Sequence, residues 1–470
     1  MQEEICLRRK VERSNVSINK KIVIILQPFH GIHERAFLLH MDKQIQELYG
    51  IFRSFPKVCT DSRKVEEGSL FFALKGPNFD GNKYVQNALG QGAAFAIIDD
   101  NDYSIEGKTF LVPDVLEALQ ELSKYHRAQL KIPIIGITGS NGKTTSKELI
   151  NCVLSTGYKV AATQGNLNNH IGVPISILSI NDTHDIGIIE MGANGHGEIK
   201  FLCEMAQPTH GLITSIGKAH LQGFGDLDGV IQEKTALYRS IASNHGIIIY
   251  NADSIYLPKH LPENTLNVAY NNHGCHSFEL GIISTFPSIN GTCKRGLLEV
   301  ALSSGMYGDY NVSNISSSLT IGALFDIPLE KGVYAINDYK PKNNRSELRE
   351  FQGAEIYLDA YNANPSSVAL IVDQFAKSVG YKILVLGDML EVGDQEDEEH
   401  HEILNKIDPE GFEEVLLFGS LYAKHNKAFS SFRFFTEFEN LKSYFDSLNL
   451  EGKGVLLKGS RGMRLERLIT

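Results

Sequence analysis

The sequence predicts an α/β protein of three domains, because near-continuous apolar runs alternate with amphipathic helical stretches along most of its 470 residues. One of these runs leads into a glycine-rich segment, residues 136–145, which ends in Lys-Thr-Thr and opens a helix. Strand-like runs return after residue 345, and each ends in Asp, Gly or Ser. Such runs suit parallel strands that are buried on both faces. We therefore expect a small N-terminal α/β domain, a central parallel-sheet domain with a phosphate-binding loop, and a C-terminal Rossmann-like α/β domain.

The composition is that of a globular protein, with 42% hydrophobic and 21% charged residues. The formal net charge of −11 argues against a general nucleic-acid binder. No apolar stretch approaches the roughly 18 residues that a membrane-spanning helix needs. The six cysteines are scattered without a C-x-x-C pair. This spacing favours the reducing cytoplasm over a disulfide framework or a zinc site.

The expected boundaries are 41–130, 131–341 and 342–470, preceded by an extension at residues 1–40. The apolar run at 22–26 is shorter than the roughly 7–15 residues of a signal-peptide core. We interpret the extension as the result of a start assigned too far upstream, with Met41 opening the first domain. The alternative is an additional strand or an interaction arm.

The elements that we expect follow the apolar runs. The first domain holds strands at Ser69–Gly76 and Ala93–Asp99 and an amphipathic helix over residues 115–130. Strands and helices then alternate as far as about Tyr339, and a polar stretch at 339–347 reads as a linker. Because ligands of such sheets bind at the carboxyl ends of the strands, the polar residues at those ends are candidate site residues.

The segment IIGITGSNGKTTSKELI predicts a phosphate-binding loop between a strand and a helix. Its glycines allow a tight turn, and the start of the helix adds unpaired N–H donors. Lys143 would place a charge on the transferring phosphates and Thr144 a hydroxyl on Mg²⁺. The spacing is not standard, because Ile137 stands where the strict pattern has glycine. The plainer interpretation is a glycine-rich turn before an ordinary helix.

Other candidates lie at the ends of predicted strands. Glu190 follows a buried run, so it is a candidate Mg²⁺ ligand or, more plainly, a helix cap or surface acid. His220 follows another run and is either structural or a metal or phosphate ligand. The segment around Lys234, taken alone, predicts a solvated surface lysine on a helix. The loop with Asn166, Asn168 and Asn169 is either a peptide-reading loop or an Asx-rich turn.

These segments, in this order, resemble the Mur ligase family from about Met41 to the C-terminus. The segments that carry the resemblance are 59–81, 136–145, 163–174, 190–199, 216–225, 307–314, 359–367, 386–393 and 458–463. The resemblance implies an ATP- and Mg²⁺-dependent, ADP-forming ligase that joins D-alanyl-D-alanine to UDP-N-acetylmuramoyl-tripeptide through an acyl phosphate. The product would be the peptidoglycan precursor UDP-MurNAc-pentapeptide. It implies a cytoplasmic enzyme, which we expect to be a monomer without nucleic-acid or membrane partners.

The resemblance also implies roles for individual residues. Those expected to contact ATP are Gly139, Ser140, Asn141, Gly142, Lys143, Thr144, Thr145, Asn311, Asn314, Arg345 and Asp359. Those expected to contact the other substrates are Ser62, Arg63, Phe72, Lys75, Asp80 and Gly81 in the UDP-sugar domain, and Asn168, Asn169, His170, Asn362 and Asn364 elsewhere. The expected Mg²⁺ ligands are Thr144, Glu190, His220 and Lys234, the last as a carbamate. The expected catalytic residues are Lys143, Glu190, His220, Lys234 and Arg345.

Two positions depart from the family pattern, since Ala236 and Gln222 stand where acids are frequent. Both departures would weaken the order around Lys234 and the metal. Two alternatives to the predicted activity stay open. One is another amide ligase of the same superfamily, which adds a single amino acid or a glutamate, and the other is a non-catalytic nucleotide-binding protein.

Overall fold

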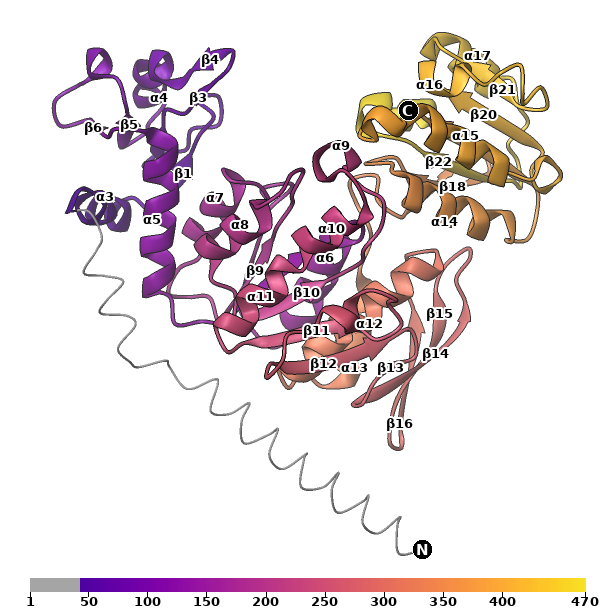
Figure 1. The fold of residues 1–470 in the computed structure, drawn as a ribbon, viewed down its shortest axis with the longest axis horizontal. Coiled ribbons are helices and arrows are strands. Elements are labelled where there is room, and N and C mark those ends of the chain that lie inside the picture. Colours follow the sequence, from indigo (N-terminus) through magenta and orange to yellow (C-terminus); the bar gives the residue numbers. More distant parts are fainter. Residues whose placement is uncertain (1–42) are drawn as a thin grey trace, which may run out of the picture. The chain divides into compact units, whose positions relative to one another are not determined.

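The computed structural model describes residues 43–470 (Figure 1). The chain divides into two compact units. The first unit holds the described residues up to Pro133 together with Pro174–Gly187, and the second holds Ile134–Val173 and Ile188–Thr470. The predicted extension at residues 1–40 and the role of Met41 lie outside the described residues.

The first unit is built on a parallel four-stranded sheet in the order β1-β2-β5-β6. Asp114 caps the long helix by accepting a hydrogen bond from the Glu117 N–H at 2.7 Å. The predicted strand at 69–76 stops at Phe72, and Lys75–Gly76 forms a separate hairpin with Phe79–Asp80. The elements are α3 (Lys43–Ser54), β1 (Val58–Cys59), β2 (Leu70–Phe72), β3 (Lys75–Gly76), β4 (Phe79–Asp80), α4 (Val85–Gly90), β5 (Phe95–Ile98), β6 (Thr109–Leu111) and α5 (Val115–Gln129).

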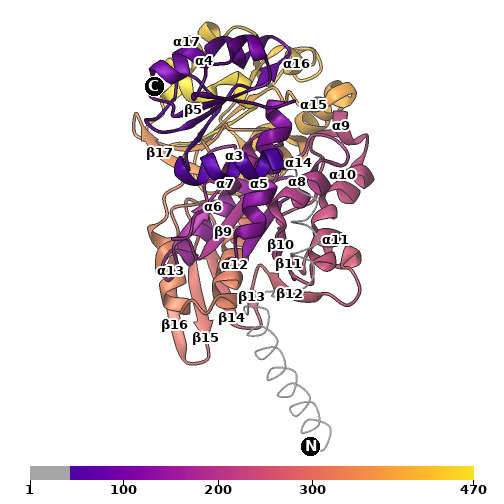
Figure 2. The same cartoon turned by 90° about the vertical axis from the view of Figure 1, so that its left-hand side faces the viewer.

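The second unit begins with a ten-stranded sheet in the order β16-β15-β14-β13-β12-β11-β10-β7-β9-β8. Helices α6, α12 and α13 pack together on one face of its parallel part and α8, α10 and α11 on the other (Figure 2). The strands are β7 (Ile134–Thr138), β8 (Val160–Ala162), β9 (Ile186–Glu190), β10 (His210–Ile213), β11 (Ile247–Asn251), β12 (Leu266–Asn271), β13 (Gly274–Cys275), β14 (Phe278–Ser284), β15 (Asn290–Arg295) and β16 (Leu298–Ser303). The helices of this unit are α6 (Lys143–Leu154), α8 (Glu198–Ala206), α9 (Leu221–Phe224), α10 (Leu227–Lys234), α11 (Ala236–Ser243), α12 (Asp309–Leu324) and α13 (Leu329–Asp338). Helix α7 (Gly172–Leu178) lies mostly in the stretch assigned to the first unit.

The expected alternation of strands and helices up to Tyr339 is wrong between β12 and α12. Strands β13 to β16 follow one another as antiparallel neighbours and extend the parallel sheet. The physical reason is that one face of this extension is open. Phe278 and Leu280 of β14 are buried, whereas Glu279 and Gly281, which alternate with them, are exposed. This two-residue period in the sequence is the signal for a half-exposed antiparallel strand.

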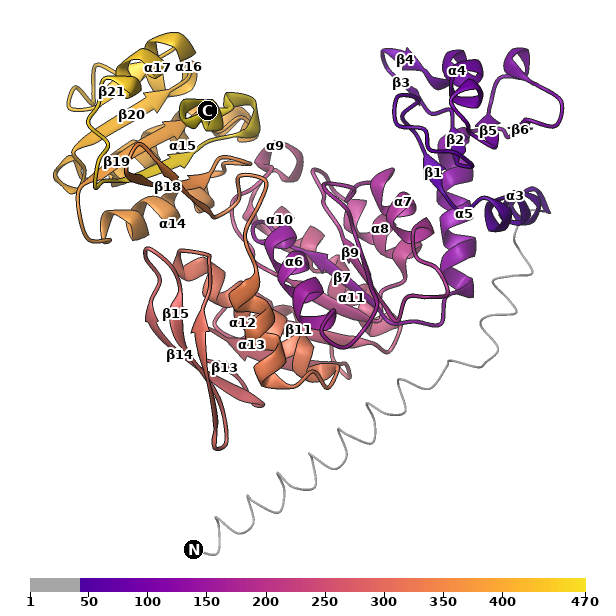
Figure 3. The same ribbon diagram turned by 180° about the vertical axis from the view of Figure 1, so that it is seen from behind.

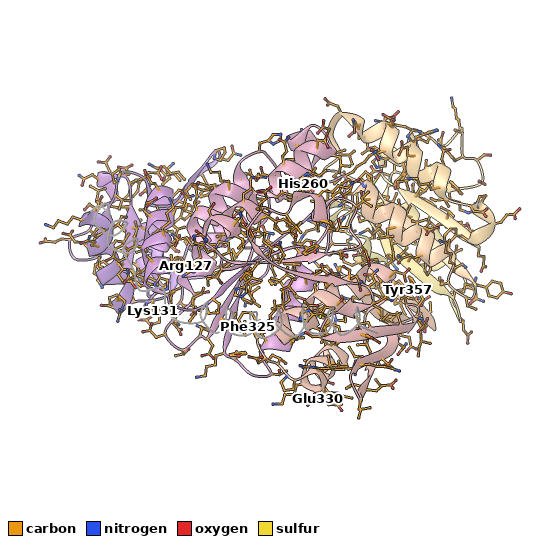
Figure 4. The ribbon with its side chains drawn as sticks, turned by 60° about the horizontal axis from the view of Figure 1, so that its bottom comes forward. Arg127, Lys131, His260, Phe325, Glu330 and Tyr357 are labelled. Carbon is orange, nitrogen blue, oxygen red and sulfur yellow. The ribbon has the colours of Figure 1, made fainter. Side chains whose placement is uncertain are left out.

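The last part of the second unit is a six-stranded sheet in the order β17-β18-β22-β19-β20-β21, in which β17 alone pairs antiparallel (Figure 3). Tyr357 of β18, labelled in Figure 4, joins a core with α14 and α15. Ile356 and Leu358 join a second core with α17, so helices cover both faces. The elements are β17 (Glu347–Phe351), β18 (Ala354–Asp359), α14 (Pro365–Ala376), β19 (Lys382–Gly387), α15 (Glu396–Lys406), β20 (Glu414–Phe418), α16 (Ser420–Ala423), β21 (Arg433–Phe435), α17 (Phe438–Asp446) and β22 (Gly454–Lys458).

The three large sheets thus occupy three successive stretches of the chain, as the predicted fold class requires. The exact boundaries at 130 and 341 stay predictions. Among residues 43–470, no helix has the length and apolar character that a membrane crossing demands.

Candidate active site

The phosphate-loop segment forms the turn between β7 and α6. Gly139 has a φ of 146°, and a Cβ there would lie 2.1 Å from the Thr214 hydroxyl oxygen. Gly142 has a φ of 82° and is the N-cap of α6. Both positions require glycine because side chains rarely adopt these backbone angles. Gly136, by contrast, lies within β7 and allows close packing against Met191.

Lys143 is folded back over this loop. Its ammonium Nζ donates hydrogen bonds to the carbonyl oxygens of Gly139 at 2.6 Å and Ser140 at 3.2 Å. Burial lowers the pKa of Lys143, and the nearby Glu190 carboxylate opposes this shift. The Lys143 ammonium is therefore held beside the loop. The backbone N–H groups of this loop and the N-terminus of α6 favour the binding of an anion.

Glu190, the last residue of β9, has one satisfied and one unsatisfied oxygen. Its Oε1 accepts hydrogen bonds from the Thr144 hydroxyl at 3.1 Å and the Asn168 amide at 2.8 Å. Its Oε2 is buried and accepts no hydrogen bond from residues 43–470, although the Lys147 ammonium lies 3.8 Å away. An orphaned carboxylate oxygen beside a hydroxyl fits Mg²⁺, which takes a few carboxylates together with phosphate and water.

His220 lies on the same pocket but pairs with an acid from another loop. Its Nδ1 is 3.1 Å from Oε2 of Glu391, and burial lowers the pKa of the imidazole while Glu391 opposes that shift. The backbone of His220 is left-handed, with a φ of 52°, at the start of α9. Within the described chain, no group of three or more His, Cys, Asp or Glu side chains is placed to hold a metal ion. The structure joins Thr144 and Glu190 by a hydrogen bond and places His220 on the same pocket, and the predicted set of four metal ligands stays a prediction.

Lys234 ends α10 and is buried, with 1% of its surface exposed. Its Nζ is 3.4 Å from the Ala193 carbonyl oxygen and 5.2 Å from the centre of the Phe224 ring. Burial, reinforced by the charge of Lys143, lowers the pKa of Lys234 to about 7. The plain interpretation as a surface lysine is therefore wrong. A neutral amine at physiological pH is the form that reacts with CO₂.

A chain of side-chain hydrogen bonds joins α6 to the segment before β17. The Ser146 hydroxyl donates to Asn314, Asn314 donates to Asn311, and Asn311 donates to the Ser346 hydroxyl at 2.9 Å. Arg345, the neighbour of Ser346, stacks on the Tyr361 ring with its guanidinium carbon 3.5 Å from the ring centre. Both predicted asparagines thus link the central sheet to the predicted linker.

The predicted amide residues have separate local roles. Asn168 binds Glu190, whereas Asn169 accepts hydrogen bonds from the N–H groups of Ile171 and Gly172, which is the Asx turn of the plainer interpretation. Asn364 caps α14 and also donates to the Asn141 side-chain oxygen at 2.8 Å.

Two further predicted residues lie at the end of β18. Lys458 forms an ion pair with Asp359 at 2.8 Å. The same ammonium donates to the Asn362 carbonyl oxygen.

A single pocket of about 720 Å³ in the second unit collects most of these residues. Its volume is in the range of small-molecule sites. It is lined by the predicted residues Ser140, Asn141, Gly142, Lys143, Thr144, Thr145, Asn168, Asn169, His170, Glu190, His220, Asn311, Asn314, Arg345, Asp359 and Asn362. Gly139, Lys234 and Asn364 are not among the residues that line it.

The predicted UDP-sugar residues lie in the first unit. Lys75 forms an ion pair with Asp99 at 2.8 Å, and Asp80 accepts from the Asn82 N–H. A Cβ at Gly81 would lie 2.5 Å from the Ala73 carbonyl carbon. The β3–β4 hairpin is therefore tightly fixed.

The remaining predicted residues of this unit differ in exposure. Ser62 and Arg63 lie between β1 and β2, and Arg63 is exposed and paired with Asp61 at 2.8 Å. Phe72 is fully buried, which leaves its main chain for any contact with a substrate.

Sequence reasoning missed Glu391, Tyr361 and Lys147. Glu391 and Tyr361 line the pocket, and each lies just beyond a strand end, which is the signal that could have found them. Lys147 follows Lys143 by one helical turn and is buried with its Nζ 2.8 Å from the Thr163 carbonyl oxygen. A charged residue on the buried face of α6 was the available signal.

Comparison with protein families identifies the class of protein. Residues 56–128 match the Mur ligase family catalytic domain, 137–322 the Mur ligase middle domain, and 344–461 the Mur ligase glutamate ligase domain. The chain belongs to the Mur ligase family, and the prediction from the sequence segments is confirmed.

Individual proteins and structures of one kind within this family are similar to the chain. A UDP-N-acetylmuramoyl-tripeptide–D-alanyl-D-alanine ligase of Bacillus subtilis (strain 168) is 34% identical over 424 residues, which cover 88% of this chain and 92% of the relative. A relative of the same name from Haemophilus influenzae is 31% identical, over 88% and 92% of the two chains. The crystal structure of MurF from Acinetobacter baumannii superposes with a TM-score of 0.80 at 26% identity, over 91% and 97% of the chains. The predicted three-domain fold class is confirmed by this likeness.

Proposed function

We propose that this Mur ligase joins D-alanyl-D-alanine to UDP-N-acetylmuramoyl-tripeptide and converts ATP to ADP and phosphate. The names of the similar ligases from several bacteria support this activity. The observation that carries it is the pocket itself. It combines a glycine-turned anion loop, the lysine head of Lys143 and the unsatisfied oxygen of Glu190.

The first chemical step is attack on ATP. A carboxylate oxygen of the tripeptide attacks the γ-phosphorus, ADP leaves, and an acyl phosphate forms. The loop from Gly139 to Thr145 holds the phosphates with its N–H groups, while Lys143 and Arg345 supply positive charge where negative charge is transferred. Mg²⁺ bound at Glu190 and Thr144 would offset the phosphate charge.

The second step forms the amide bond. The free amine of the dipeptide attacks the carbonyl carbon, phosphate leaves with the former carboxylate oxygen, and the nitrogen loses its proton. Water has to be kept out, because it would hydrolyse the acyl phosphate. Contacts across the pocket support this exclusion. The Asn364 amide meets Asn141 at 2.8 Å, and the Lys218 N–H donates to the Ser366 hydroxyl at 2.9 Å.

Carbamylated Lys234 is part of the proposal. Its burial and its pKa near 7 favour the neutral amine that combines with CO₂. Lys234→Ala should be largely inactive and partly restored by short carboxylic acids. Full activity of wild-type protein in buffer free of bicarbonate, together with failure of the acids to restore the variant, would count against the carbamate.

The remaining assignments are proposals of the same kind. The enzyme works as a cytoplasmic monomer, and the β3–β4 hairpin with Lys75, Asp80 and Gly81 belongs to the site for the UDP-sugar end of the substrate. Substituting Lys75 by Met should raise the KM for the UDP-substrate and leave the KM for ATP unchanged, because the hairpin lies outside the nucleotide pocket.

The proposed function is tested by phosphate release with a panel of acceptors. With UDP-N-acetylmuramoyl-tripeptide and Mg²⁺-ATP, the protein should release phosphate with D-alanyl-D-alanine and much more slowly with single amino acids or glutamate. Preference for a single amino acid would favour another amide ligase of the superfamily. No release with any acceptor would favour a nucleotide-binding protein without catalysis.

A further inference from the structure

Two consecutive residues of α15, Glu399 and His400, are buried outside the pocket and yet contact the two loops that carry its lining residues His220 and Glu391. Their exposed fractions are 4% and 0%, and neither lines the pocket. A buried carboxylate and a buried imidazole in adjacent positions are costly unless their hydrogen bonds are satisfied. In this helix both are satisfied by groups that lead directly to His220 and Glu391.

The hydrogen bonds of His400 define its protonation state. Its Nδ1 lies 2.5 Å from the Glu396 carbonyl oxygen, which can only accept a hydrogen. Its Nε2 lies 3.0 Å from the Met389 nitrogen, whose N–H can only donate. The imidazole is therefore neutral, with the proton on Nδ1. Burial lowers the pKa of His400 and so favours this neutral form.

The Met389 N–H that His400 accepts belongs to the loop that carries Glu391. The next N–H along the loop, that of Leu390, donates to the Ser460 hydroxyl at 2.9 Å. Two successive backbone groups are thus fixed just before Glu391. The Glu391 carboxylate then reaches Nδ1 of His220 at 3.1 Å. His400 fixes the backbone on the Glu391 side of this contact.

Glu399 fixes the loop on the His220 side of the contact between His220 and Glu391. Its Oε1 lies 2.6 Å from the ammonium of Lys218, two residues before His220. The Lys218 side chain is 45% exposed and the Glu399 side chain 5%, so the ammonium supplies the partner that this buried carboxylate needs. The ion pair also connects the loop that carries His220 to the helix that holds the Glu391 loop.

We propose that Glu399 and His400 are a positioning pair that fixes the contact between His220 and Glu391 and so closes this side of the pocket. The inference rests on the proposed ligase function. Neither residue touches a substrate, and each acts through the loop that it holds. Because small displacements in a site cost large factors in rate, loosening these loops slows amide formation and admits water to the acyl phosphate.

The first test compares His400→Phe with His400→Gln. Phenylalanine removes the acceptor for the Met389 N–H, whereas the glutamine side-chain oxygen can replace it. We expect His400→Phe to lower kcat about tenfold or more, and His400→Gln to recover most of the loss. His401→Gln is the matched control, because His401 is exposed on the same helix, and it should behave as wild type.

The decisive readout is the amide formed per phosphate released. Wild type should form nearly one amide per phosphate, while His400→Phe should fall severalfold below this ratio because water competes. A role in stability alone would lower the melting temperature and both products equally, and would leave the ratio unchanged. If the ratio is unchanged in His400→Phe while wild type forms amide, the positioning role of Glu399 and His400 is rejected. The proposed ligase function would not be affected by this result.

A second variant keeps the proposal testable if His400→Phe does not fold. Lys218→Met removes the ion pair from its exposed side and should lower the same ratio. It also leaves the buried Glu399 carboxylate without its partner, which should lower the melting temperature, but a loss of stability alone leaves the ratio of amide to phosphate unchanged. In the double variant Lys218→Met with Glu391→Gln, the loss should be about that of Glu391→Gln alone, because both act on one contact. Fully multiplicative losses, or a wild-type ratio in Lys218→Met, would overturn the proposal.

Discussion

Glu190 and Asp388 look alike in the sequence, since each is an acid at the end of a buried apolar strand, but their surroundings in the fold are opposite. Both oxygens of Asp388 accept backbone hydrogen bonds at 3.0 Å, from the N–H groups of Leu421 and Tyr422 at the start of α16. Glu190 leaves Oε2 buried and unsatisfied. A strand-end carboxylate with all its partners within the protein caps a helix, whereas one with a missing partner identifies a ligand site.

Substituting Glu190 by Gln tests the functional half of this comparison and should have the largest effect on rate. It keeps the shape and the Oε1-type acceptor but removes the charge that faces the phosphates and Mg²⁺. We expect a loss in kcat of about 10²–10³-fold, with a melting temperature within a few degrees of wild type. Phosphate release and thermal unfolding measure both. Near-normal turnover by the folded variant would show that Glu190 is not part of the active site.

Lys234 extends the comparison to a buried amine. The pH dependence of stability in wild type and in Lys234→Met tests whether this amine is neutral. Burial holds its pKa near 7 instead of 10.5, so the folded protein binds this proton less readily than the unfolded chain. In CO₂-free buffer, the stability of wild type relative to Lys234→Met should fall as the pH decreases from about 10.5 towards 7, and level off below. The expected range is on the order of a few kcal/mol. Parallel stability curves across this pH range would contradict the assignment of a buried neutral amine.

Asp388→Ala tests the architectural half of the comparison. It leaves the N–H groups of Leu421 and Tyr422 without acceptors, which should cost about 1–3 kcal/mol of stability. Chemical unfolding followed by circular dichroism would measure this loss. Glu190→Gln is the internal control, because it changes a strand-end carboxylate of similar burial. A larger stability loss in Glu190→Gln than in Asp388→Ala would reverse the comparison.

Substitutions of Asn364 should have the smallest effects. This residue caps α14 and also donates a hydrogen bond to Asn141 of the phosphate loop. Asn364→Ser should keep the cap and lose the hydrogen bond to Asn141, so that stability is retained while the KM for ATP rises a few-fold. Asn364→Ala loses both, which adds a stability cost of about 1 kcal/mol. An unchanged KM for ATP in both variants would show that the link to Asn141 does not serve nucleotide binding.

The sequence predicted the parts of the site that depend on local pattern. The phosphate loop and Glu190 follow apolar strands, and strand ends of a parallel sheet converge in space. The sequence could not predict pairings set by tertiary structure, such as His220 with Glu391. Lys234 read as a surface residue because its helix is short and its burial comes from packing that its own segment does not encode. The antiparallel extension was missed although Phe278 and Leu280 carried its two-residue period.

The most direct test of the proposed chemistry follows an oxygen atom. UDP-N-acetylmuramoyl-tripeptide labelled with ¹⁸O in its terminal carboxylate is turned over with ATP and D-alanyl-D-alanine, and the released phosphate is examined by mass spectrometry. If the carboxylate attacks the γ-phosphorus and the amine then displaces phosphate, each phosphate carries one ¹⁸O from the substrate. Phosphate without label, released together with amide product, would contradict the acyl phosphate and with it the assignment of this pocket to carboxylate activation.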